Sequence, residues 1–264
     1  MNFSYSALEH MAEMGAAQNP ELRRLAAKVG RPSRARGRTM GDAELIAKLG
    51  EFGVSIDRAW LDQQSRTHPS AEEIARVLLT DISDRGQEED WIWVCLAVLW
   101  ERWFPDRPNL EMLDDKMQRG YARNEARDEA GAARIWLDAW RDVLALADKL
   151  ALHSVEAFDL WFGGTQCLSN WVQDVTMVLW NAGLDDRGFW RERIAFCQSF
   201  LDRFSTDCDL TVENMRRDMA ETYAALGDRD RADALFQEWI EANPRWGWAG
   251  SAGRTATRCR FSAA

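Results

Sequence analysis

The sequence predicts an all-α protein built from antiparallel helix pairs. Runs that alternate Val, Ile or Thr with polar residues, the pattern of strands, are missing from the chain. Glycine and proline instead separate segments of helical periodicity. Tryptophan occurs fourteen times and tyrosine three times, and because an indole buries a large area, this composition indicates wide helix–helix contacts.

The first part of the chain is expected to form a small helical N-terminal region, residues 1–86. Residues 5–29 predict two short helices that break near Asn19 and Pro20, since proline suits a first helical turn. A basic linker is expected at residues 28–41. Residues 42–64 then predict a helix, a turn and a second helix.

Two further helices have clear ends. One begins after Ser70, whose spacing from Glu73 is that of a capping box. The apolar run Trp91–Trp100 is about ten residues long, well short of the roughly 20 that a membrane span needs. It predicts a core helix that ends before Pro105, and we place the boundary to a second domain, residues 87–248, near its start.

The second domain carries a repeat signal. Residues 112–140 and 219–244 share a tyrosine, a polar turn, and then small and aromatic residues at helical spacing. Their tyrosines, Tyr121 and Tyr223, lie 102 positions apart, three times the 34-residue period of tetratricopeptide repeats. The intervening residues 167–204 predict another helix pair.

The later segment has the residues that such a unit needs. Gly227 permits a tight turn, because a left-handed backbone strains other residues. Ala232 allows close helix approach, Phe236 fills the groove, and Pro244 ends the second helix. The expected architecture is therefore a tetratricopeptide-like α-solenoid that follows the small helical N-terminal region.

Four segments together resemble a bacterial family of unestablished molecular role: FGVSIDRAWLDQQSRTHPSAEEIA, MLDDKMQRGY, GGTQCLSNWVQDVTMVLWNAGL and NPRWGW. Its members are labelled tetratricopeptide-repeat or SEC-C-motif proteins, and the resemblance covers about residues 40–248. It implies an all-helical cytoplasmic protein. Many relatives carry a CxC…CH zinc motif after the repeats; this chain lacks it, so neither a metal nor another cofactor is expected.

Charge and cysteine usage limit the partners and the compartment. The net charge is −10 and the pI about 5.0, so the surface repels nucleic acid and anionic membranes. Arg31, Arg34, Arg36 and Arg38 predict a solvated linker or a contact with an acidic surface of the chain itself. Five separated cysteines and no signal peptide predict reduced thiols in the cytoplasm.

The candidate binding site is a polar face on the helix after residue 164. Its members are Gln166, Asn170, Gln173 and Asp174, which helical spacing places on one side. They predict either a clamp for a peptide backbone or ligand carboxylate, or hydrogen bonds that fix the register of neighbouring helices.

Catalytic residues are not expected. Glu111, Asp114 and Asp115 gather at a helix start, where carboxylates serve acid–base chemistry or simply complement the helix dipole. The three histidines lie far apart, and no HExxH pattern or phosphate-binding glycine loop is present. The chain is therefore not predicted to be an enzyme.

These observations favour a cytoplasmic protein-interaction scaffold or adaptor that binds a peptide or protein in the groove of a helical array. Trp246 and Trp248, which open a further helix, are expected to belong to the partner-binding surface. The alternative is a small-ligand-binding protein or enzyme that uses the Gln166, Asn170 and Asp174 face, which requires an enclosed pocket. A nucleic-acid role through the basic arm ranks third.

Residues 249–264 form a small, basic tail without helical periodicity. One permitted set of codons for its Gly250–Thr257, read in another frame, encodes Ile-Gly-Trp-Ala-Asp-Cys-Tyr, which continues the helix opened by Trp248. We hypothesise that a frameshift truncates the repeat array. The last helix then offers an uncapped apolar face for pairing with a second copy of the chain.

Overall fold

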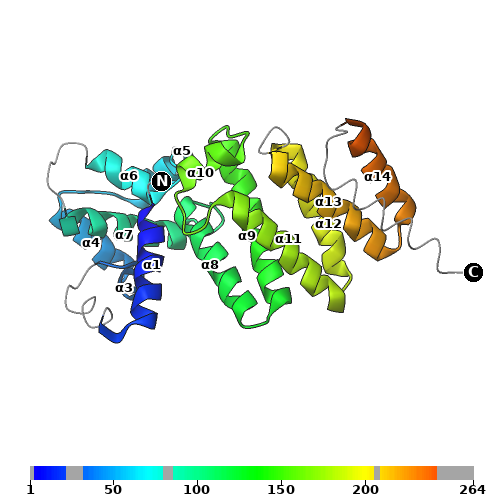
Figure 1. The fold of residues 1–264 in the computed structure, drawn as a ribbon. Helices are drawn as coiled ribbons and strands as arrows, with labels where there is room; N and C mark the ends of the chain where they lie inside the picture. Colours follow the sequence, from blue (N-terminus) through cyan, green and yellow to red (C-terminus); the bar gives the residue numbers. More distant parts are fainter. Residues whose placement is uncertain (1–2, 22–31, 80–85, 205–208, 243–264) are drawn as a thin grey trace, which may run out of the picture. The chain divides into compact units, whose positions relative to one another are not determined.

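The computed structural model describes residues 3–21, 32–79, 86–204 and 209–242, and every regular element among them is an α-helix (Figure 1). The all-α prediction is therefore confirmed. The chain divides into two compact units. Unit 1 is Met1–Arg119, Asp138–Leu152 and Ala157–Cys167, and unit 2 is Gly120–Leu137, His153–Glu156 and Leu168–Ala264.

Among the described residues, six helices lie wholly in unit 1 and three more contribute part of their length to it. The six are α1 (Tyr5–Gln18), α3 (Arg34–Thr39), α4 (Asp42–Glu51), α5 (Arg58–Thr67), α6 (Ala71–Leu78) and α7 (Gly86–Trp103). The three are α8 (Leu110–Glu125), α9 (Glu129–Lys149) and α10 (Val155–Phe162).

The ends of these helices follow the local signals. The Ser70 hydroxyl accepts a hydrogen bond from the Glu73 backbone N–H, so the predicted N-cap of α6 is confirmed. Helix α1 ends at Gln18, next to the expected break at Asn19. Helix α7 ends two residues before Pro105.

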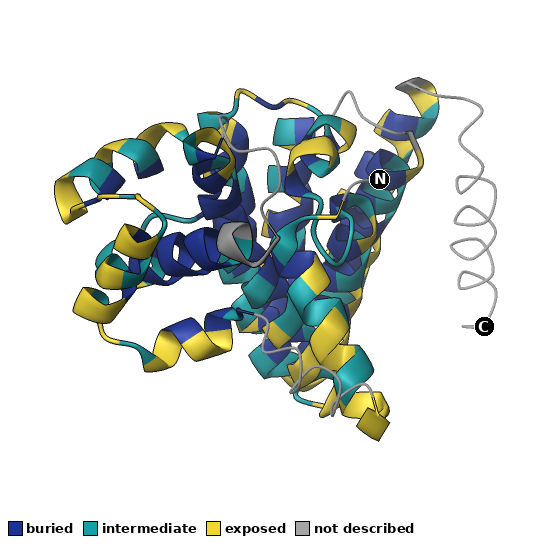
Figure 2. Ribbon diagram, turned by 90° about the vertical axis from the view of Figure 1, so that its left-hand side faces the viewer, coloured by how far each residue is buried: buried dark blue, intermediate teal, exposed yellow. Residues whose placement is uncertain are grey.

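Helix α7 forms the centre of unit 1. Every residue from Trp91 to Trp100 is buried, and Figure 2 shows such residues in dark blue. Helices α3, α4, α5 and α6 pack against it. A helix that is apolar all round requires cover on all sides, so the structure places α7 with the preceding helices, whereas the sequence suggested a domain boundary before it.

The basic linker predicted for residues 28–41 is in part a helix. Residues 34–39 form α3, which begins after the N-cap Ser33; residues 28–31 lie outside the described part of the chain. Arg34 is only 1% exposed and pairs with Glu9 and Asp115. The sequence left two predictions for the basic stretch, a solvated linker or a contact with an acidic surface of the chain itself. Arg34 makes the second kind of contact.

In the described part of unit 2, four helices lie wholly within the unit: α11 (Leu168–Asp185), α12 (Gly188–Phe204), α13 (Asp209–Leu226) and α14 (Arg229–Ala242). Each packs against the next, and α11 also packs against α13 (Figure 1). Helix α14 begins 41 residues after α12. Two consecutive helix pairs therefore stack within this unit.

Two turns of unit 2 have the same hydrogen-bond pattern. Asp128 N–H donates to the carbonyl of Arg123 between α8 and α9, and Asp228 N–H donates to that of Tyr223 between α13 and α14. Arg127 and Gly227 precede these aspartates with φ of 62° and 96°. The same pattern also ends α4 and α9, where Val54 N–H donates to the Leu49 carbonyl and Leu152 N–H to the Ala147 carbonyl. The 34-residue repeat therefore stays a prediction.

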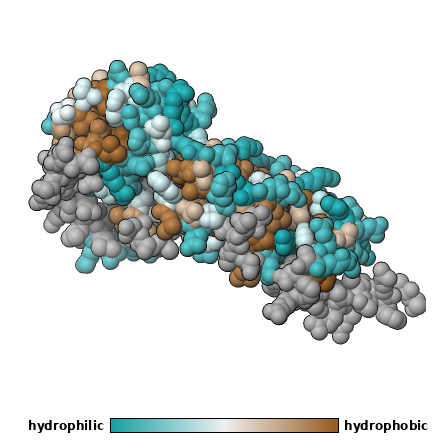
Figure 3. Space-filling model, turned by 90° about the horizontal axis from the view of Figure 1, so that it is seen from above, coloured by the Kyte–Doolittle hydropathy of each residue, from teal (hydrophilic) through white to brown (hydrophobic). Residues whose placement is uncertain are grey.

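The side chains exposed on the described residues are mainly polar. Figure 3 shows hydrophilic residues over most of one face, with hydrophobic patches between them. Across the described ranges, no helix combines the length and the apolar character that crossing a bilayer requires.

Candidate functional site: an acidic cavity with an aromatic rim

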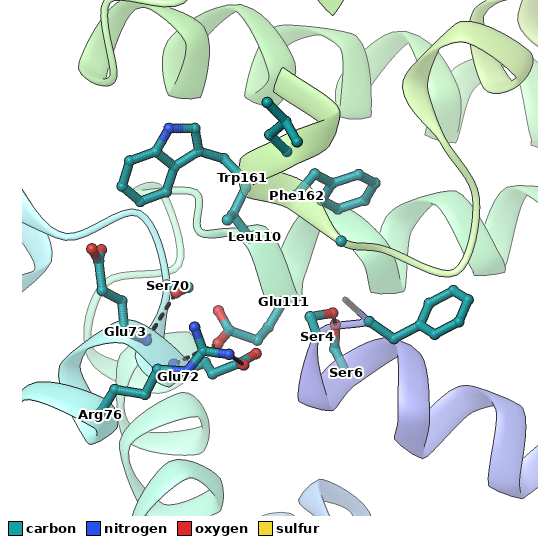
Figure 4. A pocket seen from close by; sticks show the side chains of 13 residues that line it. Ser4, Ser6, Ser70, Glu72, Glu73, Arg76, Leu110, Glu111, Trp161 and Phe162 are labelled. Carbon is teal, nitrogen blue, oxygen red and sulfur yellow. Dashed lines mark hydrogen bonds and ion pairs between the residues drawn. The ribbon is translucent and has the colours of Figure 1, made fainter. Parts of the chain in front are cut away.

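A cavity of about 200 Å³ opens on unit 1 (Figure 4). Four segments build it: the start of α1, the first turns of α6, the first turn of α8 and the end of α10. It is lined by Phe3, Ser4, Ser6, Ser70, Glu72, Glu73, Arg76, Leu110, Glu111, Leu160, Trp161, Phe162 and Gly163.

Glu111 is a buried carboxylate of this cavity. Its side-chain oxygens accept hydrogen bonds from the backbone N–H groups of Ala71 and Glu72 and from the indole of Trp93. Glu111 therefore caps α6, a helix other than its own, where the helix dipole favours a negative charge. Burial raises the pKa of Glu111, while the hydrogen bond from the Glu72 backbone opposes that rise.

Glu72 adds a second buried carboxylate. It accepts a hydrogen bond from the Tyr5 backbone N–H at 2.9 Å and pairs with the guanidinium of Arg76. The Arg76 side chain is 62% exposed, whereas that of Glu72 is 7% exposed. The positive charge that pairs with Glu72 thus lies on the water-facing side of the cavity. Solvent there screens the Arg76 charge, so it offsets the negative charge inside the cavity less.

Apolar side chains form the rim. Leu160, Trp161 and Phe3 are 83%, 46% and 43% exposed. Figure 4 shows Trp161 and Phe162 on one side of the cavity, with Glu72, Glu73 and Arg76 across from them. Large exposed apolar side chains that gather at one place mark contact sites in proteins.

Hydrogen bonds hold the walls of the cavity together. The Ser4 backbone N–H donates to the Gly163 carbonyl. The Thr165 N–H and the Ser6 hydroxyl both donate to the carboxylate of Asp114, on α8. Burial raises the pKa of Asp114, and the nearby His10 opposes the rise. The start of α1 and the segment after α10 are thereby fixed on α8.

The predicted polar face divides between local and interhelical contacts. The Gln166 side chain accepts from the Cys167 backbone N–H, and Asn170 is exposed. Gln173 on α11 accepts a hydrogen bond from the Asn214 amide on α13, and Asp174 accepts one from the Tyr121 hydroxyl on α8. Gln173 and Asp174 therefore join helices of unit 2.

Among the residues that the structure describes, the other residues singled out in the sequence form no second centre. Trp246 and Trp248 lie outside the described residues, as does the whole tail. Asp115 joins the ion pairs of Arg34 and Arg38. Where the structure is described, no three His, Cys, Asp or Glu side chains are grouped so as to hold a metal ion.

Sequence reasoning did not single out this cavity. It noted Glu111 as a residue of its own helix start and Ser70 as a cap, but it assigned nothing to Glu72 or Trp161. The hydrogen bond from the Glu72 backbone to Glu111 spans 39 residues of sequence. A signal for the rim was available in DLWFGG, where three large apolar residues precede the glycine that follows the helix.

No protein-family model, curated protein sequence or solved structure matches the chain.

Proposed function

We propose that this protein is a protein-interaction scaffold that binds a peptide segment of a partner. The observation that carries the proposal is the cavity of unit 1, whose opening bears exposed Trp161, Leu160 and Phe3. Exposed aromatic and aliphatic anchors beside a small cavity are the arrangement that peptide-binding surfaces use for affinity.

The helix pairs of unit 2 support the same class of protein. Helices α11, α12, α13 and α14 pack each against the next, as the helices of a repeat array do. We therefore assign the pairs a tetratricopeptide-like architecture, in line with the family resemblance and with the cytoplasmic role that it implies.

The alternative of a small-ligand site or enzyme on the polar face has less support. Gln173 and Asp174 already hydrogen-bond to other helices of unit 2, and a ligand clamp needs polar groups that converge on an open space. Asn170 is exposed on the surface of α11.

The proposal is tested by affinity capture from a lysate of the source organism, followed by mass spectrometry. The bait is compared with a Leu160→Ala/Trp161→Ala double variant and with a matched control, Met177→Ala/Leu184→Ala, which truncates two exposed residues of α11. We expect the same partner with wild type and control and its loss with the double variant. Equal capture by all three baits, or by none, would overturn the proposal.

A further inference from the structure

The cavity of unit 1 has an excess of negative charge. Three carboxylates line it, those of Glu72, Glu73 and Glu111, and Arg76 is the one basic side chain among its lining residues. The Arg76 guanidinium is already paired with Glu72. Glu111 accepts hydrogen bonds from two backbone N–H groups and one indole. The buried Arg34 guanidinium also acts on it electrostatically, but Arg34 does not line the cavity.

The size of the cavity limits what enters it. Pockets that enclose drug-sized ligands measure roughly 300–1,000 Å³, and this one measures about 200 Å³. It therefore suits a single side chain of a partner better than a whole cofactor or nucleotide. The exposed Leu160 and Phe3 at the rim can then cover apolar residues that flank that side chain.

The aromatic wall selects among side chains. The face of an indole attracts a cation, and the attraction grows when the cation leaves water. Arginine also lies over indole rings elsewhere in unit 1. The guanidinium of Arg34 is 5.5 Å from the ring centre of Trp93, and that of Arg36 is 5.1 Å from the ring centre of Trp91. Trp161 is half exposed and lies across the cavity from Glu72 and Glu73 (Figure 4).

We propose that the cavity binds a basic side chain of a partner peptide, arginine in preference to lysine, between Trp161 and the carboxylates of Glu72, Glu73 and Glu111. The planar guanidinium presents several donors at once and stacks on aromatic faces, whereas an ammonium is a strongly hydrated point charge. This inference rests on the proposed function, because it names the chemistry of the partner that the scaffold accepts.

The test uses the full-length protein and an array of short peptides with randomised positions. Peptides that bind are synthesised again with each arginine replaced by citrulline, which keeps the shape and removes the charge. Affinities are measured by fluorescence anisotropy for wild type and for two variants, Glu73→Gln and Trp161→Ala. Neither residue is buried, so both variants should keep the wild-type circular dichroism spectrum.

The control variants in unit 2 are one Glu→Gln replacement and one truncation of an exposed apolar side chain. They are Glu192→Gln and Leu184→Ala, both at exposed positions. We expect selected peptides to contain arginine, citrulline to weaken binding at least about tenfold, Trp161→Ala to weaken it about tenfold and Glu73→Gln to weaken it by several-fold. The controls should stay within about twofold of wild type.

Three outcomes would overturn the inference. If the selected peptides contain no basic residues, or if arginine and citrulline peptides bind with equal affinity, the cavity does not select a charged side chain. The scaffold proposal then still stands. Self-association that Trp161→Ala abolishes, seen by sedimentation, identifies a second copy of the chain as the occupant. If no peptide binds, and the three baits of the lysate experiment capture equally or capture nothing, both the scaffold proposal and the proposal of a basic side chain in the cavity are overturned.

Discussion

Buried arginines hold each unit together at the scale of single residues. Arg34 in unit 1 lies within 2.6 Å of Glu9 and 2.7 Å of Asp115. Arg193 in unit 2 is 4% exposed and pairs with Asp218 at 3.0 Å. A guanidinium has five N–H donors, so one buried side chain can satisfy several acceptors on different helices. Such a residue is difficult to replace.

Replacing Arg193 by methionine should destabilise the protein. Arg193 donates to the carbonyls of Thr176 and Asp218 and to the Thr222 hydroxyl, and all three acceptors lie in buried contacts. Removal leaves them and the Asp218 carboxylate without this donor, which costs about 3 kcal/mol of unfolding free energy. Urea denaturation measures the loss. The control Arg191→Met is at an exposed position of the same helix, and an equal loss there would contradict the prediction.

Asp115 makes stability depend on acid pH. Burial acts to raise its pKa, but the hydrogen bond with His10 and the charges of Arg34 and Arg38 hold the pKa at about 2. Because the folded pKa lies below the ordinary 3.8, the stabilisation is present above about pH 4 and is lost as the pH falls towards 2. It amounts to about 2 kcal/mol for a side chain that is 19% exposed.

The Asp115→Asn variant tests this dependence. Urea unfolding at a series of pH values should show a difference in unfolding free energy between wild type and variant that is largest near neutral pH and shrinks between about pH 4 and 2. A difference that stays constant across this range would show that Asp115 contributes packing or hydrogen bonds only.

At the scale of helices, small residues let aromatic ones reach the neighbouring backbone. Gly120 on α8 lies against Trp136 on α9, and a Cβ at this position would be 1.9 Å from the indole Nε1. The Trp136 ring also meets those of Tyr121 and Trp171 edge to face at 4.9 and 6.1 Å. Gly120, like Gly183 against Trp190, thus makes room for a tryptophan of the neighbouring helix.

Two alanine substitutions with opposite expected signs test this packing. Gly120→Ala forces the Trp136 indole to move and should lower the unfolding free energy by about 2 kcal/mol. Gly50→Ala, on α4, meets nothing within 4 Å and should raise it by about 0.5 kcal/mol, because alanine favours the helix. Thermal and urea unfolding measure both. Similar changes of either sign would refute the steric explanation.

At the scale of the molecule, burial separates the thiols into classes. Cys95 in unit 1 and Cys197 in unit 2 are fully buried, and burial raises the pKa of the Cys95 thiol to about 12 and raises that of Cys197 as well. Cys167 is half-buried. Only the thiolate reacts with alkylating reagents, so the two buried thiols require unfolding of their own units.

Pulsed alkylation with peptide mass spectrometry should therefore label Cys167 in the native protein and leave Cys95 and Cys197 unlabelled until urea unfolds the unit that holds each. Labelling of Cys95 in the native state at the rate of Cys167 would contradict the burial of α7. The unfolded protein, in which all thiols react alike, serves as the internal reference.

Local signals predicted much of the helical structure. The Ser70 cap, the break at Asn19 and the end of α7 before Pro105 were all predicted from neighbouring residues, because caps and proline act within one helical turn. The repeat inferred from Tyr121 and Tyr223 stays a prediction, because the turn hydrogen bonds before Asp128 and Asp228 also occur at the ends of α4 and α9.

The sequence by itself determined the all-α class, the apolar core helix and the charge balance, because periodicity and composition are local or additive properties. Tertiary structure decided the rest. Only folding brings Glu111 to the start of α6, 39 residues from Glu72, and sets Trp161 across from them. Partners that lie far apart in the sequence meet only when the chain between them folds back. The residue pattern within a short segment does not indicate which distant segment it will contact.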